Sequence, residues 1–305
     1  MRVETMGPAA ARQITVHSPA TGDVLGSVPI LDTAAVNAQV ARARAAQPAW
    51  AALGIDRRAQ LIVRWRALIV EHAREIAQLS CAETGKLMME ALLTDVQVTC
   101  DLARWNARRA PRVLGKKRVP VGWMITKRAY EVREPYGVVA VIGPWNFPVL
   151  NCMRSVLAAL VCGNTVVLKP SEASPLCALL MRDLASQAGI PDDVFLVATG
   201  DGATGAALVE SAIDRLCFTG SVETGRKIAR SAAERLLPLT LELGGKDAMI
   251  VLKGADLERA ADAAVAGAFL NAGQICTSIE RVYVEDGVYD EFITRVVDKA
   301  QRVKV

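Results

Sequence analysis

Two side chains in the second half of the sequence have the chemistry of a nucleophile and a base. Cys276 lies in FLNAGQICTSIER (Phe269–Arg281), among Gly, Asn, Gln, Ser and Thr rather than in an apolar run. A thiolate nucleophile is expected in such a polar loop with free backbone N–H groups. Glu242 lies in TLELGGK (Thr240–Lys246), where Leu239–Leu243 predicts a short buried strand. Burial would raise the pKa of this carboxylate towards neutrality, which suits a general base, but the spacing does not show whether the two residues meet.

The other cysteines and the histidines indicate no further chemistry. No CxxC pair is present and the only histidines are His17 and His72, so the sequence predicts neither a metal site nor a disulfide framework. Reduced thiols are typical of a cytoplasmic protein. Glu242 could equally be a structural carboxylate that accepts backbone N–H groups. Six cysteines are interpreted as inert, small hydrophobic side chains: Cys81, Cys100, Cys152, Cys162, Cys177 and Cys217.

Length and composition favour a globular protein of about two domains. The 305 residues are 52% hydrophobic, which is enough for a large core. The 36 basic and 32 acidic residues are spread along the chain with a net charge of +4, so nucleic-acid binding is not indicated. The densest basic stretch, Arg104–Arg128, is interpreted as a solvated helix face and loop. No apolar run has the length of a signal sequence or a membrane span.

The N-terminal third predicts helices that would cover a sheet. Thr15–Pro29 reads as short extended pieces around a turn. Three helices are expected from apolar residues at helical spacing: Asp32–Trp50, Asp56–Ile76 and Met88–Trp105. Pro48 is expected to close the first of them. The tryptophans of these helices are predicted to pack in the core: Trp50, Trp65 and Trp105. Pro111–Pro120 reads as a basic linker, and the alternation in Trp123–Val132 predicts an exposed hairpin strand.

From Gly137 onward, strands alternate with helices. Val138–Ile142 is a continuous apolar run, which is typical of a strand buried on both faces. The alternation predicts an α/β fold with a doubly wound parallel sheet. Ligands of such sheets bind beyond the carboxyl ends of the strands, where PWNFP, KPSE, GDG, TGS and ELGG all lie, so one nucleotide-sized site is predicted. The expected strands are Val138–Ile142, Asn164–Leu168, Val194–Ala198, Arg215–Phe218, Leu239–Leu243 and Arg281–Glu285, and the expected helices are Val149–Ala159, Leu176–Gly189, Thr204–Ser211, Thr224–Glu234, Leu257–Phe269 and Asp290–Val305.

Five motifs, in the same order, resemble those of the NAD(P)-dependent aldehyde dehydrogenase family. They are PWNFP (144–148), VLKPSE (167–172), FTGSVETG (218–225), LELGGK (241–246) and NAGQIC (271–276). The resemblance extends from about Thr15 to the end of the chain. It implies a cofactor domain over residues 1–120 and 133–243, with the helices of the N-terminal third as its outer layer.

The resemblance also implies how the remaining segments are used. Residues 121–132 would project from the cofactor domain and pair with a neighbouring subunit, so the full-length form is expected to be a homo-oligomer. Residues 244–305 would begin a second α/β catalytic domain, which in the family continues well beyond this point, so the chain is expected to be an N-terminal part. Several apolar residues are then expected to face water: Val265, Phe269, Val282, Val284, Phe292, Val296 and Val297.

The implied reaction is oxidation of an aldehyde to a carboxylate. By resemblance, Cys276 attacks the aldehyde carbonyl and Glu242 activates the water that hydrolyses the resulting thioester. The amide of Asn146, together with the backbone N–H of Cys276, would stabilise the oxyanion. From its position alone, Asn146 could equally be a turn or capping residue. The aldehyde itself is not indicated, and succinate semialdehyde is one candidate.

The implied cofactor is NAD, with NADP possible. Glu172 could accept hydrogen bonds from the adenosine ribose and would repel a 2′-phosphate, whereas the nearby Lys169 would tolerate it. Gly200–Gly205 fits GxGxxG and could hold the pyrophosphate. The resemblance instead assigns the pyrophosphate to Gly220 and Ser221, at a helix N-terminus. The full set of expected cofactor-binding residues is Ile142, Trp145, Asn146, Lys169, Glu172, Gly202, Phe218, Gly220, Ser221, Thr224 and Leu243.

Two other functions remain open. One is a catalytically incomplete fragment that still binds a nucleotide. The other is a cysteine esterase with Cys276 as its nucleophile, which would require a histidine base. Both histidines lie far from Cys276 in sequence and in no matching motif, so this alternative ranks last.

Overall fold

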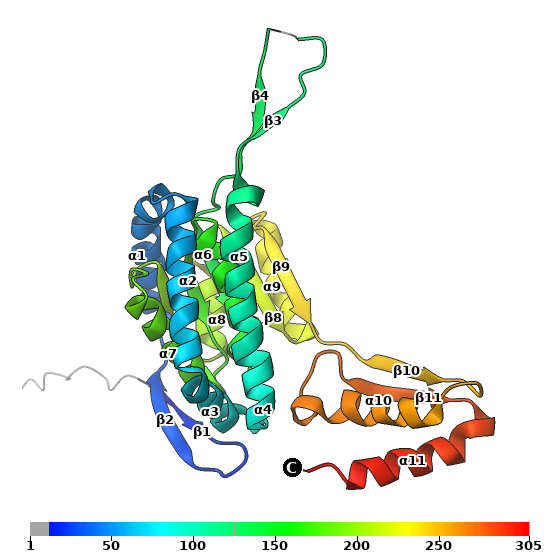
Figure 1. The fold of residues 1–305 in the computed structure, drawn as a ribbon. Helices are drawn as coiled ribbons and strands as arrows, with labels where there is room; N and C mark the ends of the chain where they lie inside the picture. Colours follow the sequence, from blue (N-terminus) through cyan, green and yellow to red (C-terminus); the bar gives the residue numbers. More distant parts are fainter. Residues whose placement is uncertain (1–11, 125, 305) are drawn as a thin grey trace, which may run out of the picture.

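A five-stranded parallel sheet forms the centre of the computed structural model, which describes residues 12–124 and 126–304 (Figure 1). The strand order β7-β6-β5-β8-β9 reverses direction between β5 and β8, so the sheet is doubly wound, as predicted. The strands are β5 (Val138–Ile142), β6 (Thr165–Lys169), β7 (Phe195–Val197), β8 (Arg215–Gly220) and β9 (Leu239–Leu243). The bounds of β5 and β9 are those predicted, and those of the other three differ by one or two residues.

Alternate residues of the buried strands pack into two different hydrophobic cores. In β5, Val139 and Val141 join the core on one face of the sheet, while Val138 and Ala140 join the core on the other. Every residue of β5 and β6 is buried. A strand covered on both faces needs apolar side chains in both registers, which explains its unbroken apolar sequence.

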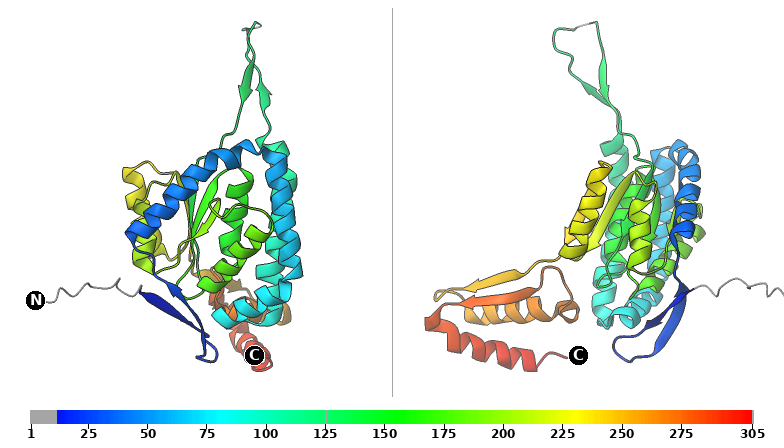
Figure 2. Two further views of the ribbon diagram at one scale, coloured as in Figure 1. Left: turned by 90° about the vertical axis from the view of Figure 1, so that its left-hand side faces the viewer. Right: turned by 180° about the vertical axis from the view of Figure 1, so that it is seen from behind.

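Helices cover both faces of the sheet (Figures 1 and 2). The first core takes residues from α2, α3, α5, α6 and α7 together with Trp50 of α1, and the second takes them from the rest of α1, α8 and α9. These helices are α1 (Thr33–Ala52), α2 (Ile55–Glu71), α3 (Ala73–Thr84), α5 (Val98–Leu114), α6 (Leu150–Val161), α7 (Pro175–Gln187), α8 (Gly202–Glu210) and α9 (Val222–Glu234). Asp32 caps α1 by accepting the N–H of Ala35.

The helix bounds expected in the N-terminal third were partly wrong. Pro48 lies inside α1, and the following turn is held by Trp50, whose Nε1 donates to the Leu160 carbonyl at 3.0 Å. The helix expected over 56–76 is two helices, α2 and α3, which meet at His72.

The helix expected over 88–105 also differs. It comprises α4 (Met88–Glu90), a π-helical segment η1 (Ala91–Gln97) and α5, which continues past Pro111. Trp105 is 57% exposed rather than in the core. The buried stripe of α5 consists of small residues, and Trp105 lies off that stripe.

Two antiparallel hairpins extend from the helical body. The first consists of β1 (Gln13–His17) and β2 (Val24–Pro29). The second, β3 (Lys117–Val119) with β4 (Ala129–Glu131), projects far from the sheet (Figure 2). A hairpin was predicted here, but its first strand lies in the expected basic linker, and Trp123 is in the connecting turn, where it is 88% exposed.

The C-terminal unit is a two-stranded parallel sheet with two helices, at the end of the molecule where β9 stops (Figure 1). Its elements are β10 (Asp247–Val251), α10 (Leu257–Phe269), the 3-10 turn η2 (Leu270–Gly273), β11 (Ile279–Val284), the 3-10 turn η3 (Asp286–Val288) and α11 (Tyr289–Gln301). Four residues form its buried core: Val251, Ala261, Ala264 and Phe292.

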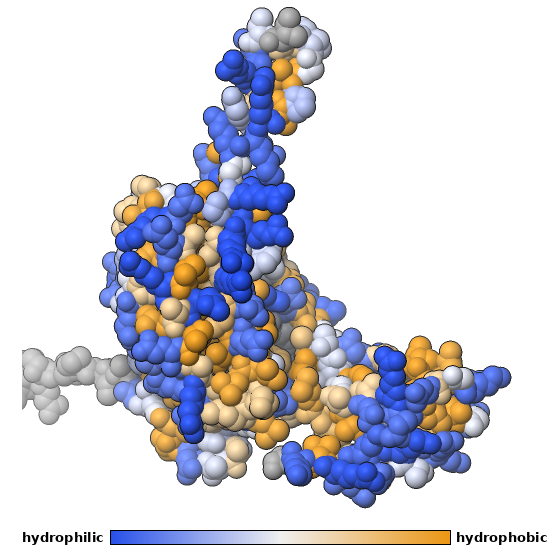
Figure 3. Space-filling model, in the orientation of Figure 1, coloured by the Kyte–Doolittle hydropathy of each residue, from blue (hydrophilic) through white to orange (hydrophobic). Residues whose placement is uncertain are grey.

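The expected exposure of apolar residues in this unit holds only in part. Phe269, Val282 and Val297 are exposed, whereas Phe292 is only 2% exposed because it packs in the small core. Val265, Val284 and Val296 are half-buried. In Figure 3, apolar side chains gather at the outer end of the unit, above α11. None of the described helices is both long and apolar enough to cross a membrane.

Candidate active site

A cavity of about 1050 Å³ lies at the carboxyl ends of the strands of the main sheet. Its wall includes the last residue of each of four strands: Ile142 of β5, Lys169 of β6, Gly220 of β8 and Leu243 of β9. The loop that carries Cys276 closes another side of it. Every residue that the sequence suggested for the site lines this one cavity: Cys276, Glu242, Asn146, Ile142, Trp145, Lys169, Glu172, Gly202, Phe218, Gly220, Ser221, Thr224 and Leu243.

Cys276 follows a strained turn and is exposed. Asn271, Ala272 and Gly273 have φ values of 56°, 56° and 73°. Glycine adopts this left-handed conformation freely, whereas other residues lose about 1–2 kcal/mol. Bonds to the turn from elsewhere in the chain must therefore offset its strain. An added Cβ at Gly245 would lie 3.2 Å from the Cys276 carbonyl oxygen, so the end of β9 passes close to this loop.

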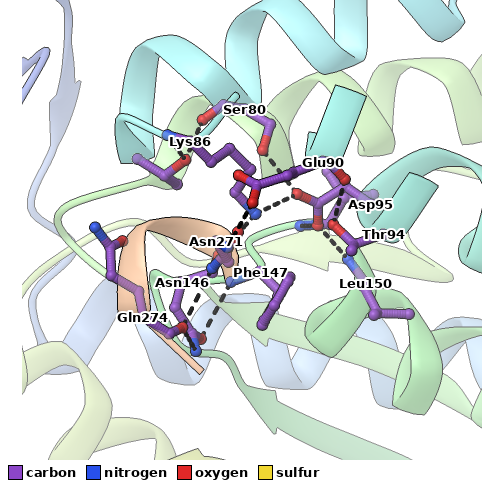
Figure 4. Close-up of polar contacts among 12 residues, drawn as sticks. Ser80, Lys86, Glu90, Thr94, Asp95, Asn146, Phe147, Leu150, Asn271 and Gln274 are labelled. Atoms are coloured by element: carbon purple, nitrogen blue, oxygen red, sulfur yellow. Dashed lines mark hydrogen bonds and ion pairs between the residues drawn. The ribbon is translucent and has the colours of Figure 1, made fainter. Parts of the chain in front are cut away.

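Asn146 is tied to the same loop. Its Nδ2 donates to the Gln274 carbonyl at 2.7 Å, and its backbone carbonyl accepts from Nδ2 of Asn271 at 3.3 Å (Figure 4). Its Oδ1 accepts the N–H of Phe147 at 3.1 Å, which is the bond of a turn residue. The Asn146 amide therefore contacts the loop two residues before Cys276. Gln274 was missed because its contribution is a backbone carbonyl, which no motif marks.

Glu242 is not buried, contrary to expectation. Its side chain is 55% exposed, because β9 is the edge strand of the sheet and this residue faces the cavity. One Nη of Arg154, on α6, lies 3.9 Å from its carboxylate. An exposed pair at this distance contributes at most about 1 kcal/mol. Arg154 also lines the cavity, and nothing in its sequence context indicated that.

A buried ion pair that the sequence did not reveal supports the loop of Asn146. Lys86 and Asp95, both with fully buried side chains, lie 2.9 Å apart. Lys86 Nζ also donates to the Asn146 carbonyl at 2.8 Å and lies 4.3 Å from the centre of the Phe147 ring. Removal of one member of such a pair typically costs about 3–5 kcal/mol, because the other charge is left buried alone.

Asp95 connects this pair to the helix that follows Asn146. One of its oxygens accepts the N–H groups of Val149 and Leu150, at 3.2 and 3.0 Å, where α6 begins. The other accepts from Lys86 and from the hydroxyl of Ser80, which donates at 2.7 Å. The carboxylate is thus fully bonded although it is buried.

Lys169 and Glu172 form a pair on the far wall of the cavity. Lys169 Nζ lies 3.1 Å from the Glu172 carboxylate. The lysine side chain is only 5% exposed, whereas that of Glu172 is 54% exposed. Lys169 is therefore held in the wall of the cavity, unlike a lysine of an ordinary exposed ion pair on a turn.

The two helix N-termini proposed for a phosphate differ in their capping. At α8, the Asp201 carboxylate accepts the N–H groups of Ala203 and Thr204, at 2.9 and 3.4 Å, so a negative charge already stands there. At α9, the neutral hydroxyl of Ser221 accepts from the N–H of Thr224 at 3.2 Å. An added Cβ at Gly220 would come within 2.6 Å of the Phe218 ring, so only glycine keeps this part of the wall open.

The other cysteines differ from Cys276 in their surroundings. Burial raises the pKa of Cys152 to about 12, and it raises the pKa of Cys177 well above the ordinary value. A thiol that stays protonated is a poor nucleophile. Within residues 12–124 and 126–304, no group of His, Cys, Asp and Glu side chains could hold a metal ion.

Sequence comparison agrees with the geometry. The chain matches the aldehyde dehydrogenase family over residues 6–305. The chain belongs to this family. It is 39% identical over 294 residues to the succinate-semialdehyde dehydrogenase [NADP(+)] of Escherichia coli, covering 96% of this chain and 60% of the relative. It is 37% identical over 295 residues to the 4,4′-diapolycopene aldehyde oxidase of Methylomonas sp, covering 96% of this chain and 56% of the relative.

Solved structures of the family have the same fold. The NAD+ complex of the aldehyde dehydrogenase from Bacillus cereus matches with a TM-score of 0.91 and 37% identity, over 96% of this chain and 60% of that one. The aldehyde dehydrogenase from Brucella melitensis biovar abortus 2308 matches with a TM-score of 0.91 and 36% identity, over the same shares. The chain thus spans about 60% of the length of the relatives that it matches.

Proposed function

We propose that this chain carries the cofactor site and the catalytic cysteine of an NAD(P)-dependent aldehyde dehydrogenase. The observation that supports this most is that Cys276, Asn146 and Glu242 line one cavity with the residues expected to hold a dinucleotide. The named relatives oxidise different aldehydes, so the proposed substrate is an aldehyde of unspecified chain.

Each of the three proposed catalytic residues has a distinct role. The Cys276 thiolate attacks the aldehyde carbon, and a C–S bond forms while the carbonyl oxygen becomes an oxyanion. The Asn146 amide donates a hydrogen bond to that oxyanion, for which it must exchange the Gln274 carbonyl, its present acceptor. Loss of hydride from the carbon leaves a thioester on Cys276. Glu242 then takes a proton from water, which attacks the thioester and releases the carboxylate and the thiol.

The cavity fits a dinucleotide. Its volume is at the upper end of the range for small-molecule sites, and it ends at the N-terminus of α9, whose cap is the neutral hydroxyl of Ser221. When bound, the nicotinamide cofactor supplies the hydride acceptor. Ser221 and Gly220 would bind the pyrophosphate through their backbone N–H groups, whereas Asp201 makes the GxGxxG loop a poor site for an anion.

Glu172 and Lys169 bear on the choice of cofactor. We propose NAD as the preferred cofactor because the exposed Glu172 carboxylate would repel a 2′-phosphate. Its pairing with Lys169 at 3.1 Å offsets part of that charge, so NADP can bind as well. Relatives with each cofactor are known by their names, NADP for the Escherichia coli enzyme and NAD+ for the Bacillus cereus structure.

We also propose a division of labour along the chain. Residues 1–120 and 133–243 would form the cofactor domain, and residues 244–305 would begin the catalytic domain. Residues 121–132 would pair with a second subunit, for which the projecting hairpin of β3 and β4 is suited by its exposure. Seven free cysteines are compatible with a reducing compartment, and we assign the protein to the cytoplasm.

No observation favours the esterase alternative. His17 lies in β1, His72 lies between α2 and α3, and neither lines the cavity. The alternative of a nucleotide-binding part without full turnover remains compatible with the share of the relatives that the chain spans. The two are separated by measuring binding and turnover independently.

The decisive experiment compares the chain with its Cys276→Ser variant. NAD binding is measured by fluorescence titration, and NADH formation is followed with a panel of aldehydes. We expect the variant to bind NAD with an unchanged Kd and to lose aldehyde oxidation by at least about a thousandfold, because a hydroxyl is far less nucleophilic than a thiolate. Retention of most of the activity would remove Cys276 from the mechanism.

A second variant tests the role of Glu242. Glu242→Gln should still form the thioester but hydrolyse it slowly, so NADH should accumulate in a burst equal to the enzyme concentration. Thr240→Ser, in the same strand, is the matched control and should show no burst. Loss of the burst itself in Glu242→Gln would instead assign Glu242 to activation of the thiol.

A further inference from the structure

The left-handed turn before Cys276 is held from a distant part of the chain. The backbone N–H of Asn271 donates to Oε1 of Glu90 at 2.6 Å, across 181 residues of sequence. The other oxygen of Glu90 accepts the N–H of Leu87 at 3.1 Å, at the start of the same helix. The carboxylate is therefore fixed by its own helix and is presented to the turn in one orientation (Figure 4).

The π-helical segment explains how this helix reaches both loops of the site. Glu90 contacts the turn at Asn271, and Asp95 contacts the loop that follows Asn146. In an α-helix, residues five positions apart point about 140° away from each other, whereas the i→i+5 bonding of a π-helix brings them to nearly the same face. The Thr94 hydroxyl donates to the Glu90 carbonyl at 2.7 Å, the acceptor that an α-helix would give to the N–H of Thr94.

The two loops also contact each other. Asn146 and Asn271 are joined by one side-chain hydrogen bond, and both amides donate to the Gln274 carbonyl, at 2.7 and 3.2 Å. The distance between the Asn146 amide and Cys276 is therefore set by where the turn at Asn271 lies. Among the described residues, Glu90 is the only side chain from a distant part of the chain that bonds the backbone of residues 271–273. The Ser278 hydroxyl, which donates to the Gly273 carbonyl, belongs to the same loop as the turn.

We propose that Glu90 is a positioning residue, whose carboxylate holds the left-handed turn at Asn271 and thereby fixes Cys276 relative to Asn146. The alternative is that Glu90 only caps its own short helix through Leu87. The two roles differ in what is lost with the carboxylate: the conformation of residues 271–276 in the first case, and only the start of α4 in the second.

The test measures hydrogen exchange of the 305-residue chain by mass spectrometry. In Glu90→Leu, amides of residues 271–276 should exchange at least about tenfold faster, while the sheet body and the melting temperature stay as in the wild type. Glu90→Gln keeps one acceptor oxygen and should restore much of the protection. Glu75→Gln removes a carboxylate of α3 whose one hydrogen-bond partner among the described residues is His72, so it should change nothing near Cys276.

Unchanged exchange at residues 271–276 in both Glu90 variants would overturn the proposal. So would faster exchange throughout the sheet body, which would make Glu90 a general support of the fold. Glu90→Ala, which also lacks the carboxylate, serves as the readout where Glu90→Leu does not fold.

A catalytic measurement deepens the test and rests on the proposed function. Displacement of a reacting group by about 1 Å can cost about a hundredfold in rate, so Glu90→Leu should lower kcat for aldehyde oxidation ten- to a hundredfold, with the KM for NAD unchanged. A loss confined to the KM for NAD would contradict positioning of Cys276. Hydrogen exchange is measured without turnover, so its result would still test the role of Glu90 if the chain did not oxidise aldehydes.

Discussion

The main sheet and the C-terminal unit are both built on parallel strands, but the central strands of the main sheet are buried whereas those of the C-terminal unit are largely exposed. In the main sheet, every residue of β5 and β6 is buried between two helical layers. In β10 of the C-terminal unit, only Val251 is buried, and Ile250 is 70% exposed. Both sheets are parallel, so the difference lies in what covers them. Parallel sheets are normally covered on both faces. The exposed face of β10 is therefore a surface that is expected to pack against another one.

Introduction of a charge into each sheet should give the largest contrast. Val167→Asp places a carboxylate at a fully buried position of β6 and should lower the free energy of unfolding by more than about 4 kcal/mol, enough to abolish folding. Ile250→Asp on β10 should change it by less than about 0.5 kcal/mol. Circular dichroism with thermal melting distinguishes the two. Equal effects would mean that the open face of β10 is covered in solution, for example by a second copy of the chain.

The burial difference also explains which predictions from the sequence succeeded. The bounds of β5 and β9 were correct because breaker residues flank each strand directly: Gly137 and Gly143 for β5, and Pro238 and Gly244 for β9. The predicted burial of Trp105 was wrong because its hydrophobicity gives no information on which side of α5 faces the sheet. The expected burial of Glu242 was wrong because a strand pattern does not reveal that the strand lies at an edge.

The support of the site could not be predicted at all. Lys86 reaches Asn146 across 60 residues, and Glu90 reaches Asn271 across 181. Lys86 lies in the loop between α3 and α4, and Glu90 lies in α4. Both are ordinary charged residues, and only the fold shows that each faces a loop of the site. Asn146, Glu242 and the expected cofactor residues could be placed at the cavity because their motifs follow strands, whereas the residues behind the cavity follow no such rule.

The small core of the C-terminal unit allows a test of whether the two regions unfold together. Phe292 is the largest of its four buried side chains, and Phe292→Ala should cost about 3–4 kcal/mol through lost burial and a cavity. We expect α11 to detach, so that trypsin cleaves residues 289–301 rapidly while the main sheet melts at its normal temperature. Phe269→Ala, at a position that is 51% exposed, is the control. A matching loss in the main sheet would show that the regions form one cooperative unit.

The buried thiols give the main sheet a pH dependence that the C-terminal unit lacks. Burial raises the pKa of Cys152 from 9.0 to about 12, so the unfolded chain loses this proton first as the pH rises. The stability that the thiol contributes is therefore fully present below pH 9 and is lost as the pH rises towards 12.

Between pH 9 and about 10.5, this loss should amount to about 2 kcal/mol. Urea unfolding of the wild type and of Cys152→Ala over that range measures it, and the curve of the variant should be flatter by that amount. Cys276→Ala removes an exposed thiol and should leave the slope unchanged. Parallel curves for the wild type and Cys152→Ala would mean that the thiol is reached by water in the folded state.

The smallest effect concerns one strained residue in each region. Leu236, between α9 and β9, has a φ of 50° and is 88% exposed, and Ala272 has a φ of 56° in the turn before Cys276. A glycine at either position removes a left-handed strain of about 1–2 kcal/mol but adds about 0.5–1 kcal/mol of chain entropy to the unfolded state. Each variant should therefore gain about 0.5–1 kcal/mol at most. Because Leu236 precedes a strand of the main sheet, Leu236→Gly should raise the main melting temperature, whereas Ala272→Gly should leave it unchanged and slow only the hydrogen exchange of residues 271–276. A rise of the main melting temperature in Ala272→Gly as well would show that strain beside Cys276 destabilises the whole fold. The two regions would then differ in burial but would unfold as one cooperative unit.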